Sequence, residues 1–386
     1  MKKTKLFIEA VPLVDKQMSG IPHALAGLVA ALAADKTIGE RFEIVLIVPG
    51  ERMELLNRWP GLEACSRRAI PMKFRVMNGL GRRGLLPPMD LLLGRGIYLF
   101  GNFFSWPLTR RSRSLTYVHD VCFAVHPELV QPDNQRMLAK NVPRFIRQSD
   151  YVITVSEAAK REIIDYFSVA AEQLIVLPNG VDHQLFHRYD MAEIEPAQEK
   201  YGLKDKEYFF FVGNIEPRKN LERLIQAFVR LPKGYALLMV GSDGWLNEKI
   251  FAAMDEANKN GHLVIKPKTY VDDDDVARLL SGAVAAVQPS LHEGFGMPVL
   301  NALAAQTLSV AADIPPLCEV AAEAAIYCDP QSVDSITEAL TKAATITSSD
   351  KKKLTDLGFH RSQQFTWPAT AKKLAGLLIK IQKDLS

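Results

Sequence analysis

Short apolar runs alternate with amphipathic stretches along almost the whole chain of 386 residues. Apolar runs bounded by turn residues predict strands, and apolar residues three and four positions apart predict helices. In the first half, this pattern predicts strands at 6–8, 42–48, 97–100, 115–118, 151–155 and 174–177, and helices at 21–34, 134–149 and 157–167. Ser156 is placed to cap the last helix. Such alternation predicts parallel sheets with crossover helices, an α/β fold.

The segment 182–206 interrupts this rhythm, because it contains no strand pattern and is typical of a linker with a short helical piece. Beyond it, strands are predicted at 208–212, 236–240, 263–265, 283–288 and 308–311, and Asn220 is expected to cap the helix after the first of them. We therefore expect a domain of residues 1–182, a linker of 183–206 and a domain of 207–366. An amphipathic helix at 367–385 is expected to pack across the back of the domains, the first included.

The composition, 48% hydrophobic and 24% charged, is ordinary for a soluble globular protein with two cores. No apolar run approaches the ~20 residues of a membrane-spanning helix. The stretch after the basic start is interrupted by Glu9 and Asp15, so a cytoplasmic protein is expected rather than an exported one. The four cysteines form no C-x-x-C pair, which favours reduced thiols over disulfides or a zinc site.

Positive charge is concentrated in the first half of the chain. Residues 1–170 carry 24 Lys and Arg against 16 Asp and Glu, although the whole chain has a net charge of only +3. The excess lies in residues 50–115, with 12 basic and 4 acidic residues. One interpretation is a peripheral contact with anionic lipid at the inner face of a membrane, or with a phosphorylated acceptor. The other is a solvated basic face.

Parallel sheets bind ligands at the carboxyl ends of their strands, so two such domains predict a cleft between them. In the first domain, Gly20 stands in the loop Met18-Ser19-Gly20 before a helix, where its backbone would approach an anion. His119 follows the strand 115–118 and would bond a sugar hydroxyl or stabilise charge. A turn glycine and a structural histidine are the alternatives.

Two loops of the second domain carry the strongest signals. Arg218 and Lys219 are adjacent cations before a helix, where they would neutralise a diphosphate; a solvated pair is the alternative. The loop 289–296 offers the backbone N–H groups of two glycines and a helix start to phosphate or sugar oxygens. Glu293 in this loop would accept hydrogen bonds from sugar hydroxyls, unless it caps the helix.

These stretches together resemble the retaining family-4 glycosyltransferases of the GT-B fold. The pieces that carry the resemblance are 116–120, 152–159, 213–220, 290–300, 312–315, 327–330 and 365–367. The resemblance covers nearly the whole chain and is weakest at 50–95, where acceptors usually bind. It implies two Rossmann-like domains whose parallel sheets face an interdomain cleft. It also implies hexosyl transfer from a nucleotide sugar, with no metal ion, no other cofactor and no nucleic-acid partner.

The resemblance further implies a role for individual residues. Arg218 and Lys219 would hold the donor diphosphate, while Glu293 and His119 would face the transferred sugar as the catalytic candidates. Gly20 would approach the phosphates. Main-chain groups would hold the rest of the donor, at Gly294, Phe295, Gly296 and Met297 for the sugar and phosphate and at Tyr270 and Val271 for the base.

One position departs from the pattern of the family. Members usually carry a second glutamate eight residues after the first, which binds the ribose, and this chain has Asn301 there. A neutral amide loses the strength of a charge-assisted hydrogen bond, about 1–2 kcal/mol. We expect activity to survive. The alternatives are weaker donor binding, a changed donor, or a catalytically silent GT-B protein that binds a glycan or a partner.

The acidic run Asp272–Asp275 needs a separate interpretation, because paired carboxylates hold a metal ion in other transferases. Here the run directly precedes apolar residues at helical spacing. Aspartates are favourable in the first turn of a helix. The run is therefore predicted to cap a helix, and no metal requirement is expected.

Catalysis is expected to come from cations and backbone amides that bind the leaving diphosphate and stabilise the charge that develops on it. The resemblance implies front-face attack assisted by a donor phosphate oxygen, with domain closure that excludes water. The motifs resemble those of bacterial mannosyltransferases, so we expect GDP-mannose as donor and a growing polysaccharide or lipid-linked glycan as acceptor. A UDP-hexose is the alternative donor. No G-x-G-x-x-G follows a strand, which argues against an NAD-dependent enzyme.

Overall fold

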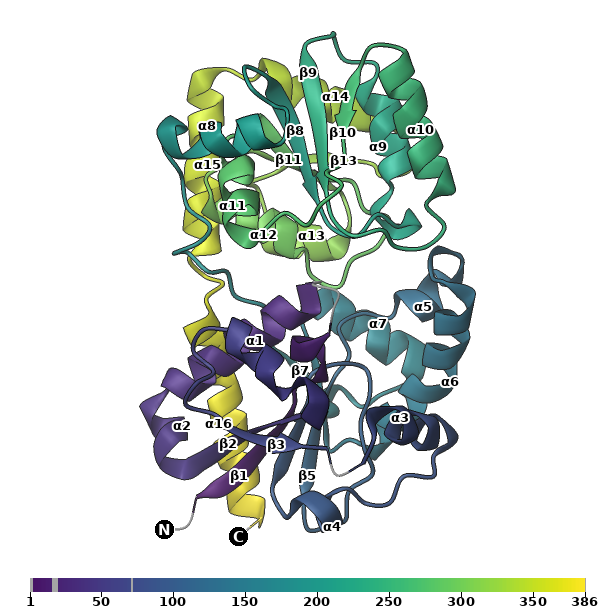
Figure 1. Cartoon of the computed structure of the whole chain (residues 1–386), viewed down its shortest axis with the longest axis vertical. Helices are drawn as coiled ribbons and strands as arrows, with labels where there is room; N and C mark the ends of the chain where they lie inside the picture. The colour runs from purple at the N-terminus through teal and green to yellow at the C-terminus, as the bar shows by residue number, and fades with distance from the viewer. Residues whose placement is uncertain (1–2, 16–19, 71, 386) are drawn as a thin grey trace. The chain divides into compact units, whose positions relative to one another are not determined.

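The computed structural model describes residues 3–15, 20–70 and 72–385, without the side chains of residues 74, 75, 78 and 82. The chain divides into two compact units. Unit 1 comprises Met1–Val125, Pro132–Gly180 and Thr366–Ser386, and unit 2 comprises His126–Gln131 and Val181–Phe365. Figure 1 labels most of the helices and strands of both units.

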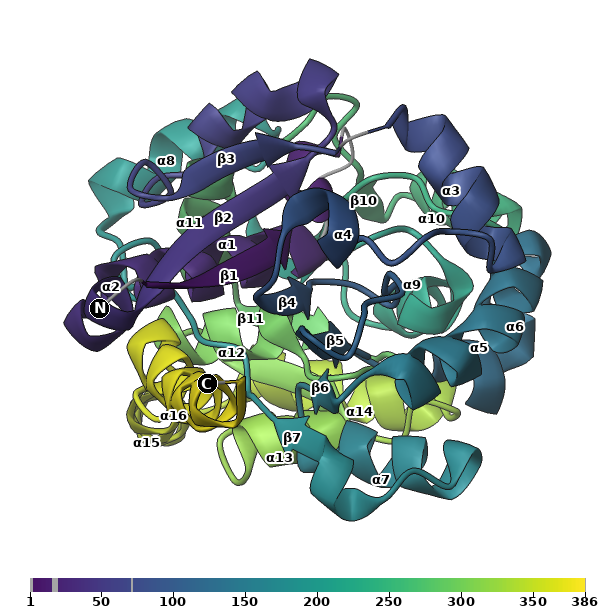
Figure 2. The same cartoon turned by 90° about the horizontal axis from the view of Figure 1, so that it is seen from below.

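Unit 1 contains a seven-stranded parallel sheet in the order β3-β2-β1-β4-β5-β6-β7, whose strands lie side by side in Figure 2. The strands are β1 (Thr4–Glu9), β2 (Phe42–Val48), β3 (Ser66–Ala69), β4 (Ile97–Phe100), β5 (Arg113–Tyr117), β6 (Tyr151–Thr154) and β7 (Leu174–Val176). The helices are α1 (Gly20–Ala34), α2 (Lys36–Arg41), α3 (Phe74–Arg83), α4 (Asp90–Leu93), α5 (Cys122–Val125), α6 (Pro132–Gln148), α7 (Glu157–Phe167) and α16 (Trp367–Leu385). Strands that are buried on both faces have continuous apolar runs, as residues 44–48 of β2 do.

Unit 2 contains a six-stranded parallel sheet in the order β10-β9-β8-β11-β12-β13. The strands are β8 (Glu207–Val212), β9 (Tyr235–Val240), β10 (Leu263–Ile265), β11 (Ala285–Gln288), β12 (Ser309–Ala312) and β13 (Ile326–Cys328). The helices are α8 (Met191–Lys200), α9 (Leu221–Phe228), α10 (Glu248–Lys259), α11 (Asp273–Ser281), α12 (Met297–Ala304), α13 (Pro315–Ala321), α14 (Val333–Thr345) and α15 (Ser348–Ser362).

Two apolar layers form the core of unit 2. One packs α9, α10 and α14 on the sheet, and the other packs α8, α11 and α12. Alternation along β8 explains the division, because Phe209 and Phe211 belong to the first layer while Tyr208 and Phe210 belong to the second. A helix on each face of a parallel sheet is the arrangement that the alternating pattern predicts, so the predicted α/β class is confirmed.

The predicted strands are all present within two residues of their predicted ends, and Ser156 Oγ caps α7 by accepting from Ala159 N at 2.9 Å. Two strands were missed. β3 has the sequence Ser-Arg-Arg-Ala and lies at a sheet edge, and β13 has only three residues. In both, the apolar pattern is too short or too polar to indicate a strand. Among the described residues, no helix has the length and apolarity to cross a membrane.

The helix α16 packs against α1 within unit 1, although the two are separated by most of the chain. The contact depends on Gly27 in the middle of α1. A Cβ atom built on Gly27 would lie 2.4 Å from Cε2 of Trp367, the first residue of α16. Only a residue without a side chain lets the indole lie against this helix.

We predict that Gly27→Ala destabilises the protein by about 1–3 kcal/mol, because the added methyl group must displace the Trp367 indole. Gly376→Ala in α16 is the matched control, since no atom lies within 4 Å of its built Cβ. The control is expected to stabilise by about 0.5–1 kcal/mol through helix propensity. Urea unfolding measures the free energy of unfolding of both variants. Changes of the same sign in the two variants would contradict this account of the contact between Gly27 and Trp367.

Candidate functional site

The carboxyl ends of β8 and β11 bring two predicted loops of unit 2 together. The loop after β8 carries a short 3-10 turn, Pro217–Lys219, and the loop after β11 leads to α12. The N–H of Leu291 donates to the carbonyl of Arg218 at 2.9 Å, which joins the two loops through their backbones. Adjacent parallel strands end at the same sheet edge, so these side chains converge although they are far apart in sequence.

The Glu293 carboxylate accepts four hydrogen bonds in this site. Oε1 accepts from Lys219 Nζ at 2.6 Å, from Gln288 Nε2 at 2.8 Å and from Ser290 Oγ at 2.8 Å. Oε2 accepts from Arg218 Nη1 at 2.9 Å. The side chain is only 8% exposed. Glu293 therefore forms ion pairs with both predicted diphosphate-binding cations, and its partners show no capping of α12.

Arg218 also pairs with a second buried carboxylate. Glu216 Oε1 accepts from Nη2 of Arg218 at 2.8 Å and from Nε at 3.1 Å, and Glu216 is 1% exposed. We call Glu216, Arg218, Lys219 and Glu293 the charged cluster. Its two cations and two carboxylates cancel, so the cluster has no net charge when all four are ionised.

Burial and ion pairing shift the pKa values of these groups in opposite directions. Burial raises the pKa of the Glu293 carboxyl, but the charges and hydrogen bonds of Lys219 and Arg218 outweigh it and hold the pKa well below its ordinary range. Burial lowers the pKa of the Lys219 ammonium, against the attraction of Glu293. Glu293 is therefore ionised throughout the physiological pH range.

Asn220 is the N-cap residue of α9, as predicted, but it does not cap the helix through its side chain. Asn220 occupies the capping position in the left-handed conformation, with φ 60°, but its side chain makes no capping hydrogen bond. Its Nδ2 instead donates to the carbonyls of Pro289 and Pro330 at 2.9 and 2.7 Å. Asn220 thereby holds the loops that follow β8, β11 and β13 at fixed positions, a role that sequence pattern does not indicate.

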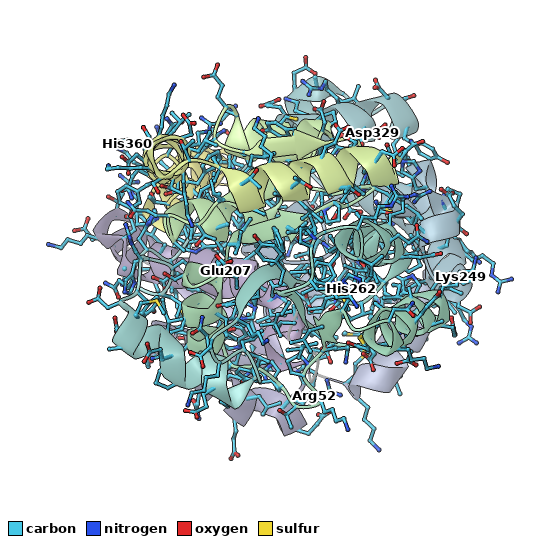
Figure 3. All side chains as sticks on the ribbon, turned by 90° about the horizontal axis from the view of Figure 1, so that it is seen from above. Arg52, Glu207, Lys249, His262, Asp329 and His360 are labelled. Carbon is cyan, nitrogen blue, oxygen red and sulfur yellow. The ribbon has the colours of Figure 1, made fainter. Side chains whose placement is uncertain are left out.

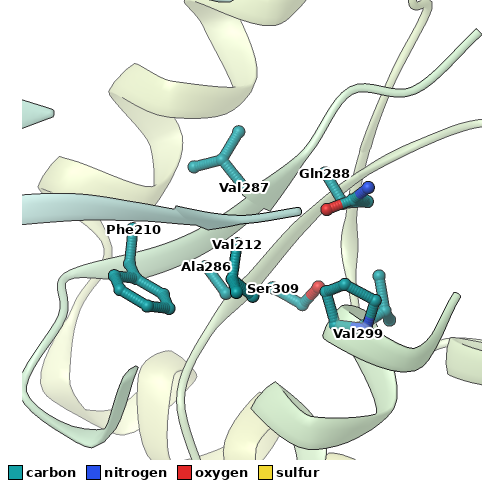
Figure 4. A pocket seen from close by; sticks show the side chains of 8 residues that line it. Phe210, Val212, Ala286, Val287, Gln288, Val299 and Ser309 are labelled. Atoms are coloured by element: carbon teal, nitrogen blue, oxygen red, sulfur yellow. The ribbon is translucent and has the colours of Figure 1, made fainter. Parts of the chain in front are cut away.

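Gln288, which donates to Glu293, also lines a cavity of about 10 Å³, shown in Figure 4. Its lining includes Gln288, Ser309, Val299 and Phe210. Gln288 Oε1 and Ser309 Oγ have no hydrogen-bond partner among the described residues. The volume suits one water molecule and excludes a sugar. This cavity is therefore not the donor site.

The start of α12 is formed by the predicted glycine loop. Gly296 precedes the helix with φ 110°, and a Cβ there would lie 2.4 Å from Cδ2 of Leu317. Gly294 and Phe295 are buried in the loop, and Met297 begins the helix. Asn301 lies one turn further along α12, and its Oδ1 is buried without a hydrogen-bond partner among the described residues.

The other predicted donor contacts of unit 2 lie in the loop between β10 and α11. Tyr270 is 62% exposed and Val271 is buried. The acidic run follows directly, and the prediction that it caps a helix is confirmed. Asp272 is the N-cap of α11 and accepts from Asp275 N at 2.8 Å, while Asp275 pairs with Lys200 at 2.6 Å.

The site residues predicted in unit 1 lie at the carboxyl edge of its sheet. Gly20 begins α1, while Met18 and Ser19 lie outside the described residues. His119 follows β5, and its Nε2 lies 3.1 Å from the carbonyl oxygen of Gly101. Burial lowers the pKa of His119, which favours the neutral imidazole.

Glu9 at the end of β1 was missed by sequence reasoning. It pairs in register with Phe100 of β4, the residue before Gly101, so it lies two strands from His119 at the same edge. Its Oε1 accepts from Val11 N at 3.2 Å. Burial raises the pKa of this carboxyl to about 7, against the Val11 hydrogen bond. A charged residue that ends an otherwise apolar strand was the available signal.

The basic residues of 50–115 are spread over several elements. Arg95, Arg110 and Arg111 are exposed before β4 and β5, and Leu91 and Leu92 of α4 are also exposed. Nε of Arg95 donates to the Arg111 carbonyl at 3.0 Å, so these two arginines define a basic surface. Its contact with anionic lipid stays a prediction, which co-sedimentation with phosphatidylglycerol vesicles would measure.

Comparisons with known proteins identify relatives of both units. Residues 193–356 match the family model "Glycosyl transferases group 1", and residues 23–185 match the model "Glycosyltransferase Family 4". The O-antigen chain mannosyltransferase B of Escherichia coli is 29% identical over 262 residues, which cover 67% of this chain and 68% of that protein. The serotype-specific mannosyltransferase WbdA of Escherichia coli is 27% identical over 67% of this chain, but the match spans only 32% of WbdA.

The solved structure of Anabaena HepE in complex with UDP and glucose has the same fold. Its TM-score is 0.76 at 16% sequence identity, and the match covers 98% of this chain and all of that one. An identity this low shows the fold alone. The predicted GT-B fold is confirmed by this match together with the two parallel sheets.

We predict that Lys219→Met and Glu293→Gln each destabilise the protein by about 3–5 kcal/mol, because each breaks a buried ion pair by removing one of its two members. The double variant is expected to recover most of the loss, which urea unfolding would measure. The exposed pair Lys352–Asp356 is the control, whose coupling should stay below about 1 kcal/mol. Additive losses at positions 219 and 293 would contradict the pairing.

We also predict a pH dependence that originates at Glu9. Its pKa in the folded state, about 7, lies above the ordinary 4.5, so its contribution to stability is present below pH 4.5 and is lost as the pH rises to 7. The free energy of unfolding of the wild type should therefore fall by up to about 3 kcal/mol relative to Glu9→Gln over this range. Urea titrations at pH 5 and pH 8 measure the difference, and parallel profiles would refute it.

Proposed function

Since the chain belongs to the group 1 glycosyltransferases of family 4, we propose that it transfers mannose from GDP-mannose to a glycan or lipid-linked acceptor in polysaccharide synthesis. The mannosyltransferase relatives support the sugar, because their names state that specificity. HepE holds UDP and glucose in a chain of the same fold, which keeps a UDP-hexose as the alternative donor.

The observation that carries the proposal is the convergence of Arg218, Lys219 and Glu293 beside the start of α12. Two cations and the N–H groups of a helix start are the groups that stabilise charge on a leaving diphosphate. In this proposal Arg218 and Lys219 bind the diphosphate, and the amides of Gly294–Met297 bind phosphate and sugar. Glu293 binds hydroxyls of the transferred sugar.

The remaining contacts complete the proposed donor site. Asn301 binds the ribose, and its unpartnered Oδ1 supports this role because a ribose hydroxyl would supply the missing donor. The main chain at Tyr270 and Val271 frames the base. In unit 1, Gly20 approaches the phosphates and His119 bonds the sugar. Transfer proceeds with retention, by front-face attack, so no protein nucleophile is required.

We predict that the wild type binds GDP-mannose more tightly than UDP-glucose, and that Arg218→Gln with Lys219→Gln reduces nucleotide affinity at least tenfold. Two lost cations remove charge-assisted hydrogen bonds of about 1.5–3 kcal/mol each. Isothermal titration with both nucleotide sugars measures this. Lys249→Gln with Lys259→Gln is the control of equal charge, since both are exposed on α10 and Lys249 projects from the surface in Figure 3.

Unchanged affinity in the variant at positions 218 and 219 would overturn the proposed donor site. A wild type that binds a nucleotide sugar but neither hydrolyses nor transfers it would favour the alternative motivated by Asn301, a silent protein that binds a glycan or a partner. Asn301→Glu separates these outcomes. Under the proposed function this variant gains donor affinity, because a carboxylate restores the charge-assisted bond to the ribose.

A further inference from the structure

The charged cluster is closed on itself. Lys219 is buried against Glu293, and Arg218 lies between Glu293 and Glu216, with the Glu216 and Glu293 side chains 1% and 8% exposed. A diphosphate that approaches this cluster meets cations whose charges are already neutralised. The structure therefore holds the phosphate-binding side chains in an ion-paired state that a donor must alter.

The four donors are unevenly shared between the two oxygens of Glu293. Oε1 accepts from Lys219, Gln288 and Ser290, which is more than its two lone pairs, and Oε2 accepts from Arg218. Departure of Lys219 leaves Oε1 with its two neutral donors. Departure of Arg218 opens Oε2 to the hydroxyls of a sugar.

We propose that donor binding is a counter-ion exchange, in which the diphosphate replaces Glu293 as the partner of Lys219 and Arg218 and the released carboxylate binds the sugar. This inference rests on the proposed function. Gln288 and Ser290 are neutral donors without a charge for the diphosphate to attract, so in this proposal they stay with Glu293 when the cations turn away. Arg218 likewise keeps its pairing with Glu216.

Under this exchange, the presence of the sugar changes how tightly the diphosphate binds. A nucleoside diphosphate alone takes the cations and leaves Glu293 with fewer partners, whereas a nucleotide sugar returns hydroxyl donors to it. Glu293 therefore opposes binding of the diphosphate and favours binding of the whole donor. Removal of the Glu293 charge is therefore expected to strengthen the binding of the nucleoside diphosphate. It is also expected to remove most of the additional affinity for the nucleotide sugar.

The test compares GDP with GDP-mannose, and UDP with UDP-glucose in parallel, by isothermal titration of the full chain. Glu293→Gln is expected to bind the nucleoside diphosphate three- to tenfold more tightly than the wild type and to lose most of the additional affinity for the nucleotide sugar. Glu222→Gln removes a carboxylate from the first turn of α9, outside the cluster, and should change either affinity less than twofold.

If Glu293→Gln folds poorly, a second pair of variants tests the same exchange. Lys219→Met and the double variant Lys219→Met with Glu293→Gln differ only in Glu293, and the double variant buries no unpaired lysine. The double variant should bind the nucleoside diphosphate more tightly than Lys219→Met, since Glu293 still competes for Arg218.

Diphosphate affinity that is unchanged or weaker on removal of Glu293 overturns the exchange, as does an equal gain in Glu222→Gln. Unchanged affinity would assign Glu293 to the sugar alone, and weaker affinity would make it a fixed support of the cations. These results leave the proposed function intact. A wild type that binds none of the four nucleotides refutes the proposed function itself.

Discussion

A buried carboxylate that neutralises two cations is the interaction on which the site of unit 2 depends. An isolated ion of either sign would be costly at this depth, and only the combination of opposite charges with further hydrogen bonds makes the burial tolerable. Glu293 has both, because Gln288 and Ser290 add neutral hydrogen bonds to its ion pairs. The backbone bond from Leu291 to Arg218 and the Asn220 side chain keep the loops in register.

The same interaction reconciles two expectations that conflict when the side chains are considered singly. Arg218 and Lys219 are expected to bind phosphate, and Glu293 is expected to bind sugar, yet in the structure they bind one another. A site in which ligand groups replace protein counter-ions needs no large rearrangement of the backbone. When no donor is bound, the ion pairs of such a site also stabilise two cations and a carboxylate that would otherwise be buried without partners.

Much of the fold follows from the sequence because its signals are local. The apolar run of β2 and the Ser156 cap of α7 depend on a few adjacent residues. The edge strand β3 could not be recognised, since its stability comes from pairing with β2 rather than from its own residues. Packing of α16 on α1 through Gly27 depends on contacts more than 300 residues apart, which periodicity within either helix does not encode.

The candidate site shows the same difference between local features, which the sequence predicts, and long-range contacts, which it does not. Its loops and the residue types within them could be predicted, because parallel strands place the following loops at one edge. The partners of each side chain could not, since Glu293 contacts residues 74 and 75 positions away. Asn220 illustrates the limit, because its identity suited a side-chain cap, while in the structure its Oδ1 accepts from Arg223 and its Nδ2 donates to the carbonyls of Pro289 and Pro330. Glu216 and Glu9 were overlooked for the same reason, as their burial is a property of the folded units.

The charge balance of unit 2 also bears on the departure at position 301. A glutamate there would add a third carboxylate to a unit in which the two cations of the cluster are already matched by Glu216 and Glu293. A buried carboxylate without a cationic partner lowers the stability of a protein when no ligand is bound. Asn301 avoids this cost, at the expense of a weaker bond to the ribose. The neutral amide is therefore compatible with donor binding in this chain.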